Sequence, residues 1–376
     1  MINIRPVDFY NKKRKIKVCY ILSYRSPDYI RTITILNAIG RIKYLSVSRA
    51  INTFRSVLFR YVETLLKLLY IRFTKRPDFY ILGFRGYEIF WPVRLLTYGK
   101  PLIFDHMMSP YDSIVNERNI CRKGGVLDKL IYGYEKSLLH HSNFVLTDTD
   151  LHRDYFIKLF NLPLEKIHAI PVSTDEKLFL RYSDVSSRVD SKDFFDVFYY
   201  GSFLPLHGVD VILEAARILS DKPIRFIMVG GKRQMVNKFH EKNVIHKRWV
   251  DYEQLPDWID KADLCLGGPF GNTGQAKRVI TGKTFQFLAM SKPTIVGIID
   301  KEYGFKDRDN ALVVPQGDGE ALAGAIRWAF DNQEQLSDIG RRGQKLYLKN
   351  FSIDQVKDAL LNIFLYDSLN KGLNND

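Results

Sequence analysis

The sequence predicts an α/β protein made of two doubly wound domains, each with a parallel sheet. Its 376 residues are more than one hydrophobic core usually organises. Short apolar runs of strand character alternate with segments of helical periodicity, which is typical of parallel sheets covered by helices. A polar stretch at residues 181–193 interrupts this alternation and is typical of a linker. We therefore place one domain at residues 1–180 and a second at 194–352, followed at 353–376 by a helix that can cross back to the first domain.

The predicted strands fall into two series. In the first domain they are 17–22, 79–83, 102–104, 144–147 and 167–170, and in the second 197–200, 225–229, 244–246, 264–266, 294–297 and 311–314. Helical periodicity begins at Tyr29, recurs over 50–73, 151–160 and 209–219, and closes the chain at 334–349 and 353–366. Because ligands of open parallel sheets bind beyond the carboxyl ends of the strands, we look for a site in the loops that follow them.

The composition is that of a globular protein, with 46% hydrophobic and 26% charged residues. We expect no membrane-spanning helix, because no uncharged apolar run reaches about 18 residues. We also expect no signal peptide, because the basic residues at 12–17 are followed by an apolar run of strand length only. The cysteines, Cys19, Cys121 and Cys265, are far apart, which favours a reducing compartment and gives no zinc pattern. A cytoplasmic location is the expectation.

The positive charge is concentrated at the start of the chain. Residues 1–76 hold 17 Lys and Arg against three acids, which accounts for the whole formal net charge of +14. Such an oriented basic surface suits an anionic membrane, a nucleic acid or an acidic polymer. We expect no nucleic acid, because the sequence has no RNA-recognition, zinc-finger or basic-zipper signature. The expected partner of residues 1–76 is therefore an anionic membrane surface.

The predicted helix at 50–73 is amphipathic, with an unusually wide apolar face. Its polar residues form one narrow stripe, which consists of Asn52, Ser56, Arg60, Glu63 and Lys67. Apolar residues cover most of the remainder, and basic residues flank the helix on both sides. Such a helix either lies in a lipid interface or packs on the sheet with its basic residues exposed, and the two arrangements are compatible.

The most informative segment, 197–219, combines a strand, a glycine turn and a helix. Gly201 and Ser202 end the strand, and Gly208 comes directly before the helix. The first amides of such a helix lack backbone partners and carry the positive end of the helix dipole, so they suit a phosphate group. The alternative interpretation is an ordinary strand, turn and helix without a ligand.

The loop and helix at 269–293 form a second candidate anion site. Two glycines allow a ligand to approach the backbone and a threonine offers a hydroxyl group; these are Gly271, Gly274 and Thr273. Arg278 and Lys283, together with a neighbouring lysine, bring positive charge to the same segment. The alternative is a solvated basic face.

Together these segments resemble the group 1 glycosyltransferases of family 4, which have the GT-B architecture. Gly201, His207 and Gly208 are similar to the family's glycine turn and to the pair that opens its next helix. The strand at 226–229 ends in the diglycine Gly230-Gly231, as strands of the family do. Residues 269–293 look like the nucleotide-sugar loop, its helix and the exit from that helix. The resemblance is clearest over 197–315, and Lys283 favours a subgroup known in polysaccharide biosynthesis.

The resemblance implies two Rossmann-like domains that face a cleft. It also implies transfer of a sugar, with retention, from a nucleotide-diphosphate sugar, which is a substrate; no metal or other cofactor is required. The implied donor site consists of Gly201, Ser202, His207, Gly208, Gly230, Gly271, Thr273, Gly274, Arg278, Lys283 and Gln286. Lys283 and Arg278 would stabilise the departing diphosphate, and Gln286 would hold the ribose.

Three positions depart from the family pattern. Arg278 and Gln286 stand where the family usually has two glutamates, and Ser202 stands where many members have an arginine. Gln286 can still hydrogen-bond a ribose hydroxyl, whereas Arg278 has no acceptor with which to replace a carboxylate. These departures leave the donor sugar open. They also support a second hypothesis, in which the protein is a non-catalytic GT-B scaffold or partner subunit that binds nucleotide or membrane.

Asp105 and His106 end a predicted strand of the first domain and are the acceptor-side candidates, where family members often carry such residues. A turn or helix cap is the alternative for both, and Asp112 is a second choice. The Asp-Thr-Asp sequence at 148–150 has the spacing of a metal-binding motif, but it precedes a helix, so we predict an N-cap there.

The sequence therefore predicts a glycosyltransferase. We expect it to act on a lipid-linked or polysaccharide acceptor while associated peripherally with the cytoplasmic face of the plasma membrane. Its expected partners are the nucleotide-sugar donor, that acceptor and the anionic membrane surface.

Overall fold

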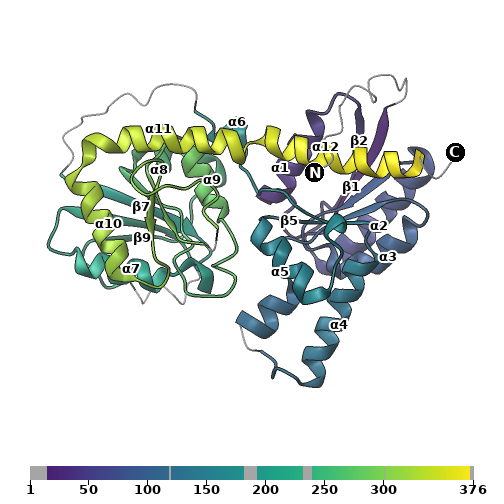
Figure 1. The fold of residues 1–376 in the computed structure, drawn as a ribbon, viewed down its shortest axis with the longest axis horizontal. Coiled ribbons are helices and arrows are strands. Elements are labelled where there is room, and N and C mark those ends of the chain that lie inside the picture. Colours follow the sequence, from purple (N-terminus) through teal and green to yellow (C-terminus); the bar gives the residue numbers. More distant parts are fainter. Residues whose placement is uncertain (1–14, 118–119, 182–192, 232–238, 300, 373–376) are drawn as a thin grey trace. The chain divides into compact units, whose positions relative to one another are not determined.

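In a computed structural model the chain forms two α/β units (Figure 1). The structure describes residues 15–117, 120–181, 193–231, 239–299 and 301–372. The first unit comprises Met1–Val172 and Ile353–Asp376, and the second comprises Ser173–Ser352. Each is built on a six-stranded sheet whose paired strands are parallel. The predicted α/β architecture of two doubly wound parallel sheets is confirmed.

The sheet of the first unit has the order β2-β1-β3-β4-β5-β6. Its strands are β1 (Ile16–Leu22), β2 (Leu45–Ile51), β3 (Phe79–Leu82), β4 (Leu102–Asp105), β5 (Phe144–Thr147) and β6 (Ile167–Ala169). Two helices, α1 (Ile30–Gly40) and the C-terminal α12 (Ile353–Gly372), pack together on one face of this sheet. Figure 1 shows α12, in yellow, running beside α1.

The opposite face of the same sheet is covered by four helices. These are α2 (Val57–Thr74), α3 (Phe90–Leu96), α4 (Val126–His141) and α5 (Asp150–Phe160). The arrangement follows from the right-handed crossover rule, because the chain steps from β1 to β2 in one direction and then returns through β3 to β6 in the other. Alternate residues of β1 serve the two cores, so Tyr20 faces α1 and α12 while Ile21 faces α2 and α3.

The predicted helix at 50–73 is wrong at its beginning. Ala50 and Ile51 belong to β2, and α2 starts at Val57 after the N-cap Ser56. β2 is an edge strand that pairs only with β1, and most of its residues are half-buried or exposed. An edge strand needs little apolar character to be stable, so the sequence of β2 has no clear strand pattern. Its last residues were therefore counted as part of the helix that follows.

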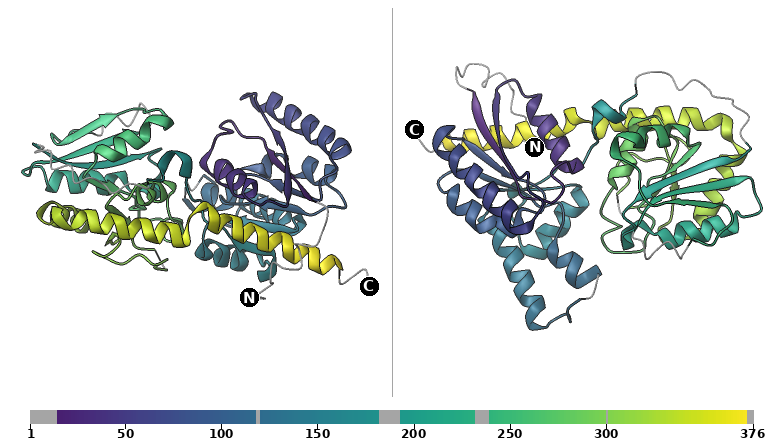
Figure 2. Two further views of the ribbon diagram at one scale, coloured as in Figure 1. Left: turned by 90° about the horizontal axis from the view of Figure 1, so that it is seen from above. Right: turned by 180° about the vertical axis from the view of Figure 1, so that it is seen from behind.

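The sheet of the second unit has the order β12-β11-β10-β7-β8-β9. Its strands are β7 (Phe195–Gly201), β8 (Ile224–Gly230), β9 (Val244–Lys247), β10 (Leu264–Leu266), β11 (Thr294–Gly297) and β12 (Leu312–Val314). Its helices are α6 (Glu176–Phe179), α7 (Val209–Ile218), α8 (Leu255–Lys261), α9 (Gly282–Ala289), α10 (Gly319–Asp331) and α11 (Gln333–Asn350). Helices α7 and α10 pack together over one face of the sheet, and the views in Figure 2 show the sheet between helical layers.

Two further expectations concern the chain as a whole. Most of the predicted linker, 182–192, lies outside the described residues. Within the described ranges, none of the helices combines the length and the apolar character that crossing a bilayer requires.

Candidate functional site

The candidate site lies at the carboxyl ends of the central strands of the second unit. The chain runs from β7 to β8 and β9 on one side, and it then crosses to β10, β11 and β12 on the other side of β7. The loops that leave β7 and β10 therefore lead to helices on opposite faces, α7 and α9. Ligands of open α/β sheets bind at such a reversal of strand order.

The two loops pack backbone against backbone through glycines. Gly208, directly before α7, has a φ of 62°, a left-handed conformation that favours glycine. A Cβ atom at Gly208 would overlap the amide nitrogen of Gly271, and one at Gly271 would overlap the carbonyl oxygen of Pro205. Gly271 also donates a backbone hydrogen bond to the carbonyl of Leu206 at 3.1 Å. These glycines thus fix the two predicted anion-binding loops to each other.

Gly230 likewise allows close backbone packing, here between the ends of the neighbouring strands β7 and β8. Its φ is 116°, and a Cβ atom there would overlap the carbonyl oxygen of Gly201. A Cβ at Gly201 would in turn lie 3.1 Å from the Tyr199 hydroxyl and 3.4 Å from the His207 ring. The glycine turn after β7 is therefore enclosed by the diglycine after β8 and by the side chains of Tyr199 and His207.

Lys283 is the central charged group of this region. It lies in the first turn of α9, is only 6% exposed, and its Nζ atom lies 5.0 Å from the centroid of the Tyr199 ring. Among the described residues no hydrogen-bond or ion-pair partner of Lys283 is present. Burial lowers the pKa of Lys283 to about 7, because the charged ammonium loses its hydration without gaining a carboxylate.

His207 is a neutral neighbour of this lysine. Its Nδ1 atom accepts a hydrogen bond from the backbone amide of Leu204 at 3.2 Å. Burial, with a further contribution from the charge of Lys283, holds the pKa of His207 well below its usual range. The structure thus brings Gly201, His207 and Lys283 together, and it adds Tyr199, which the sequence analysis counted only as an apolar strand residue.

Gln286 lies one helical turn beyond Lys283 and is also buried. Its amide nitrogen donates a hydrogen bond to the Tyr252 hydroxyl at 3.3 Å. The amide oxygen is buried and has no hydrogen-bond partner among the residues that the structure describes. Tyr252 was not predicted, and no local pattern could have found it, since it lies 34 positions from Gln286 along the chain.

The rest of the predicted donor set lies on a more open surface. Thr273 Oγ1 accepts a hydrogen bond from the Ala276 amide at 3.1 Å, so this hydroxyl closes a local turn. Ser202 and Gly274 are exposed, and Arg278 is half-buried with a guanidinium nitrogen near Gly274.

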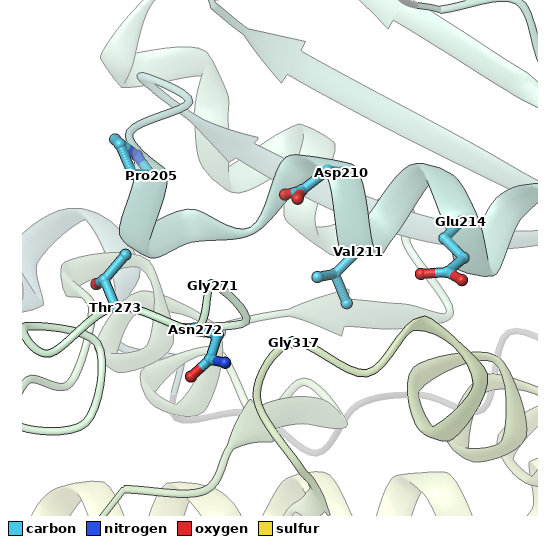
Figure 3. Close-up of a pocket in the computed structure, with 8 residues that line it drawn as sticks. All are labelled: Pro205, Asp210, Val211, Glu214, Gly271, Asn272, Thr273 and Gly317. Carbon is cyan, nitrogen blue, oxygen red and sulfur yellow. The ribbon is translucent and has the colours of Figure 1, made fainter.

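A pocket of about 450 Å³ opens beside the packed loops (Figure 3). It is lined by Pro205, Asp210, Val211, Glu214, Gly271, Asn272, Thr273 and Gly317. The lining includes Gly271 and Thr273 from the predicted set, but neither Lys283 nor Gln286. Figure 3 shows the two carboxylates, Asp210 and Glu214, on α7 above the loop with Gly271. Their negative charge makes this pocket a poor place for a diphosphate.

In the first unit, the candidate Asp105 is fully buried and paired with Arg31. The Nε and Nη2 atoms of Arg31 lie 3.0–3.2 Å from the Asp105 carboxylate. Arg31 also donates to the backbone carbonyls of Ile170 at 2.7 Å and Pro171 at 3.0 Å. The ion pair therefore joins α1, β4 and the segment after β6. The sequence analysis missed Arg31, which lies 74 positions before its partner.

The neighbouring candidate, His106, is bound to Glu135 of α4. The His106 Nε2 atom lies 2.8 Å from a Glu135 oxygen, and the other oxygen accepts from the Tyr111 amide at 2.7 Å. The Nδ1 atom of His106 is buried, and none of the described residues forms a hydrogen bond with it. The second-choice residue, Asp112, accepts from the Tyr155 hydroxyl at 2.9 Å.

The predicted N-cap at 148–150 is confirmed. Thr149 is the N-cap of α5, and its hydroxyl accepts from the His152 amide at 3.1 Å. Asp148 instead binds the His152 ring at 2.8 Å. In the described part of the chain, no three His, Cys, Asp or Glu side chains come close enough together to hold a metal ion.

A family model described as "Glycosyl transferases group 1" matches residues 195–332. The second unit belongs to the group 1 glycosyltransferases. The matched range runs from the start of β7 to the end of α10 and contains every donor-side candidate. The expected resemblance is thereby confirmed, and the chain carries a glycosyltransferase domain.

Solved structures extend the likeness in fold to both units. HepE of Anabaena, solved with UDP-glucose, is 12% identical with a TM-score of 0.69, over 94% of this chain and 100% of that one. Sucrose-phosphate synthase of Thermosynechococcus elongatus is 14% identical with a TM-score of 0.68, over 95% and 100%. A glycosyltransferase of Rickettsia africae is 12% identical with a TM-score of 0.63, over 94% and 98%. Comparison with curated protein sequences finds no match. The GT-B architecture expected for the glycosyltransferase is confirmed.

Proposed function

We propose that this group 1 glycosyltransferase binds a nucleotide-diphosphate sugar at the carboxyl ends of β7, β8 and β10. It transfers the sugar, with retention, to a lipid-linked or polysaccharide acceptor at the cytoplasmic face of the plasma membrane. The observation that carries the proposal is Lys283, a buried cation with no anionic partner in the described parts of the chain. A buried charge without a partner is costly to keep, so such a residue is expected where a ligand supplies the opposite charge.

A diphosphate meets that requirement. Negative charge develops on the diphosphate as the sugar departs, and a fixed cation in a water-poor site stabilises it as it forms. Each charge-assisted hydrogen bond contributes about 1.5–3 kcal/mol. Lys283, the amides of the turn at Gly201 and the first turn of α7 are the groups we assign to the diphosphate, with Arg278 as a further contact. The donor is a substrate, and the proposal includes no metal or other cofactor.

Gln286 is the residue we assign to the donor ribose. Its amide nitrogen is held by Tyr252, which leaves the buried oxygen as an acceptor for a hydroxyl group. HepE, which has the same fold, was solved with UDP-glucose, so UDP-glucose is the first donor to test.

On the acceptor side we keep Asp105 and His106 as the assigned residues. Asp105 is already bound by Arg31, so we assign it to holding the end of β4 in position. His106 retains an unpartnered Nδ1 atom, and this atom is the one we expect to meet the acceptor hydroxyl.

The test compares Lys283→Ala with Lys277→Ala, since Lys277 is an exposed lysine of the preceding loop. Thermal shift with UDP-, GDP- and CDP-sugars identifies the donor, and a nucleotide-release assay reports turnover. We expect Lys283→Ala to lose the donor-dependent shift and the turnover while it keeps its fold, and Lys277→Ala to keep all three. Turnover at the normal rate in Lys283→Ala would refute the assignment.

A second candidate is a non-catalytic scaffold. It is favoured by Arg278 and Gln286, which replace the usual pair of glutamates. The same assays separate the two: a scaffold gives a thermal shift with a nucleotide but releases no nucleotide from any sugar donor.

A further inference from the structure

Most of the large apolar side chains exposed by the described residues lie on three neighbouring helices of the first unit. We call this surface the α2–α4 face. On α2 they are Val57, Leu58, Phe59, Val62, Leu66, Leu69, Tyr70 and Phe73; on α3, Trp91 and Leu95; and on α4, Val126, Leu127, Leu130 and Tyr134. Folded monomers rarely expose a continuous apolar surface of this kind unless it binds something.

Helix α2 buries a stripe that is only partly apolar and leaves most of its large apolar side chains exposed. Its inner stripe contains Arg60 and Thr64, whose side chains bond inward to Glu88 at 2.8 Å and to the Leu22 carbonyl at 3.1 Å. Its outer side chains Leu58, Phe59, Leu66, Tyr70 and Phe73 are 61–70% exposed. The sequence analysis expected the wide apolar side either in lipid or on the sheet. The structure buries Leu68 and Ile71 against the sheet together with Arg60 and Thr64, and it leaves the other large apolar side chains outside.

Exposed apolar side chains also lie on α3 and α4, which cover the same face of the sheet as α2. Helix α2 contacts α3, and α3 contacts α4. Leu95 on α3 is 75% exposed, and Val126 on α4 is 77% exposed. Tyr98, just after α3, is 76% exposed. The surface therefore extends well beyond residue 76, where the excess of basic residues ends.

The unpaired charges around this face are mostly positive. The carboxylates of the three helices are all engaged: Glu63 binds Lys67 and the Thr53 hydroxyl, Asp128 accepts from the Gly124 amide, and Glu135 binds His106. Most exposed charged residues at the ends of the helices and on α4 are basic, namely Arg55, Lys75, Arg76, Lys100, Arg122, Lys123 and Lys129. The acidic Glu88, just before α3, is paired with Arg60 and Arg85.

We propose that the α2–α4 face docks on an anionic lipid bilayer. Its apolar side chains enter the boundary between headgroups and acyl chains, and its basic rim pairs with lipid phosphates. Trp91, Tyr70 and Tyr98 are of the residue types that favour this depth. A second copy of the chain fits less well, because two identical basic rims would repel each other. The inference deepens the proposed function, since it identifies the surface that would hold the enzyme beside a lipid-linked acceptor.

The test is flotation of the full chain with vesicles of phosphatidylcholine and phosphatidylglycerol in equal parts, and with vesicles of phosphatidylcholine alone. We expect the wild type to float with the anionic vesicles. The triple variant Leu58→Ser, Phe59→Ser, Phe73→Ser is expected to lose at least tenfold in partitioning. The control Ile245→Ser, Leu348→Ser, which changes exposed apolar residues of the second unit, is expected to bind as the wild type does. Lys75→Ala with Arg76→Ala is expected to reduce binding to the anionic vesicles only.

Equal flotation of the triple variant and the wild type would overturn the proposal. So would a wild type that ignores both vesicles and forms a dimer in light scattering that the triple variant disperses, since a second copy would then cover the face. Thermal shift by the sugar donor, measured on the same proteins, separates this inference from the proposed function. If the protein binds the donor but not the vesicles, only the membrane-docking proposal is refuted. If it binds the vesicles but not the donor, only the assigned donor site is refuted.

Discussion

The Nζ atom of Lys283 lies 5.0 Å from the centroid of the Tyr199 ring, and both residues are buried. The face of an aromatic ring attracts a cation but carries no net charge with which to neutralise it. The Tyr199 hydroxyl is itself buried, and it has no hydrogen-bond partner within the described ranges of the chain. The two residues therefore form the place at which we propose that the anionic diphosphate binds. Two consequences, one for donor binding and one for stability, can be measured.

Donor affinity should fall as the pH rises above neutrality. Burial lowers the pKa of Lys283 to about 7, so the free protein loses this charge above pH 7, whereas the bound diphosphate requires it. The neighbouring groups do not titrate in this range, because burial holds the pKa of His207 below it and raises that of Tyr199 above it. We expect the dissociation constant of UDP-glucose to be flat below pH 7 and to rise by up to about tenfold per pH unit above it. Calorimetry between pH 6 and 9 measures this.

Lys283→Arg provides the control, because a guanidinium stays protonated throughout this range. Its affinity for UDP-glucose should be lower but independent of pH. A wild type whose affinity does not change between pH 6 and 9 would show that Lys283 does not bind the diphosphate.

Replacement of Lys283 by methionine should stabilise the ligand-free protein, and more so at low pH. The folded-state pKa of about 7 lies below the unfolded value near 10.5, so the unfolded chain binds the additional proton between these values. The contribution of Lys283 therefore becomes more favourable as the pH rises through that window. Below pH 7 burial of the charge costs on the order of 5 kcal/mol. Urea denaturation at pH 6.5 and pH 10 should show a large gain in unfolding free energy for Lys283→Met at the lower pH and little at the higher. An equal gain at both would contradict the lowered pKa.

The parts of the fold that the sequence could predict are those in which a local pattern is decisive. β5, β10 and β11 coincide with their predicted ranges, because each is a short, fully buried run between polar turns. The start of α7 was predictable for a similar reason, since the left-handed backbone conformation directly before the helix requires a glycine, Gly208. The edge strand β2 was not, because half of its surface faces solvent and its residues carry little apolar signal.

The candidate site was predictable only in part, because its residues act through partners distant in sequence. A glycine-rich loop predicts an anion site, but the pairing of Lys283 with Tyr199 and of Gln286 with Tyr252 depends on which loops the sheet order brings together. In the same way, periodicity identified the two sides of α2 but did not indicate which side would face the sheet. The inward polar stripe is accommodated by Glu88 and by the carbonyl of Leu22, and neither belongs to the helix.

The contact between the two loops predicts a large effect of mutation at one glycine of the donor set and a small effect at another. Gly208→Ala should destabilise the second unit, because alanine resists a φ of 62° by about 1–2 kcal/mol and its Cβ would overlap the Gly271 amide. The two loops would have to separate, so donor affinity should fall as well. Gly274→Ala is the matched control, since its Cβ would meet only an Arg278 nitrogen at 3.5 Å. It should change the unfolding free energy by less than about 1 kcal/mol. Thermal denaturation of both variants checks this, and equal destabilisation would contradict the role of the loop contact.

Mutation should separate the role of the Gln286 amide oxygen from that of its amide nitrogen. Gln286→Leu removes the unpartnered oxygen, so we expect UDP-glucose to bind about tenfold more weakly, which corresponds to one hydrogen bond of about 1.4 kcal/mol. Tyr252→Phe removes the partner of the amide nitrogen instead, which should cost about 1–3 kcal/mol of stability by leaving a buried donor unpaired. Binding and denaturation curves distinguish the two. If Gln286→Leu binds UDP-glucose as tightly as the wild type, the ribose assignment is wrong.

The buried pair of Arg31 and Asp105 should respond to mutation as a unit. Asp105→Asn leaves the guanidinium of Arg31 buried without its countercharge, and Arg31→Met leaves the carboxylate of Asp105 buried without its countercharge. Each single variant should therefore lose about 3–5 kcal/mol of unfolding free energy. The double variant Arg31→Met, Asp105→Leu carries no buried charge and should recover part of this loss. Recovery should be incomplete, because the carbonyls of Ile170 and Pro171 lose the donor that Arg31 provides. A double-mutant cycle on the unfolding free energy measures the coupling. Single variants that unfold like the wild type but lose turnover would instead mean that Asp105 contacts the acceptor directly.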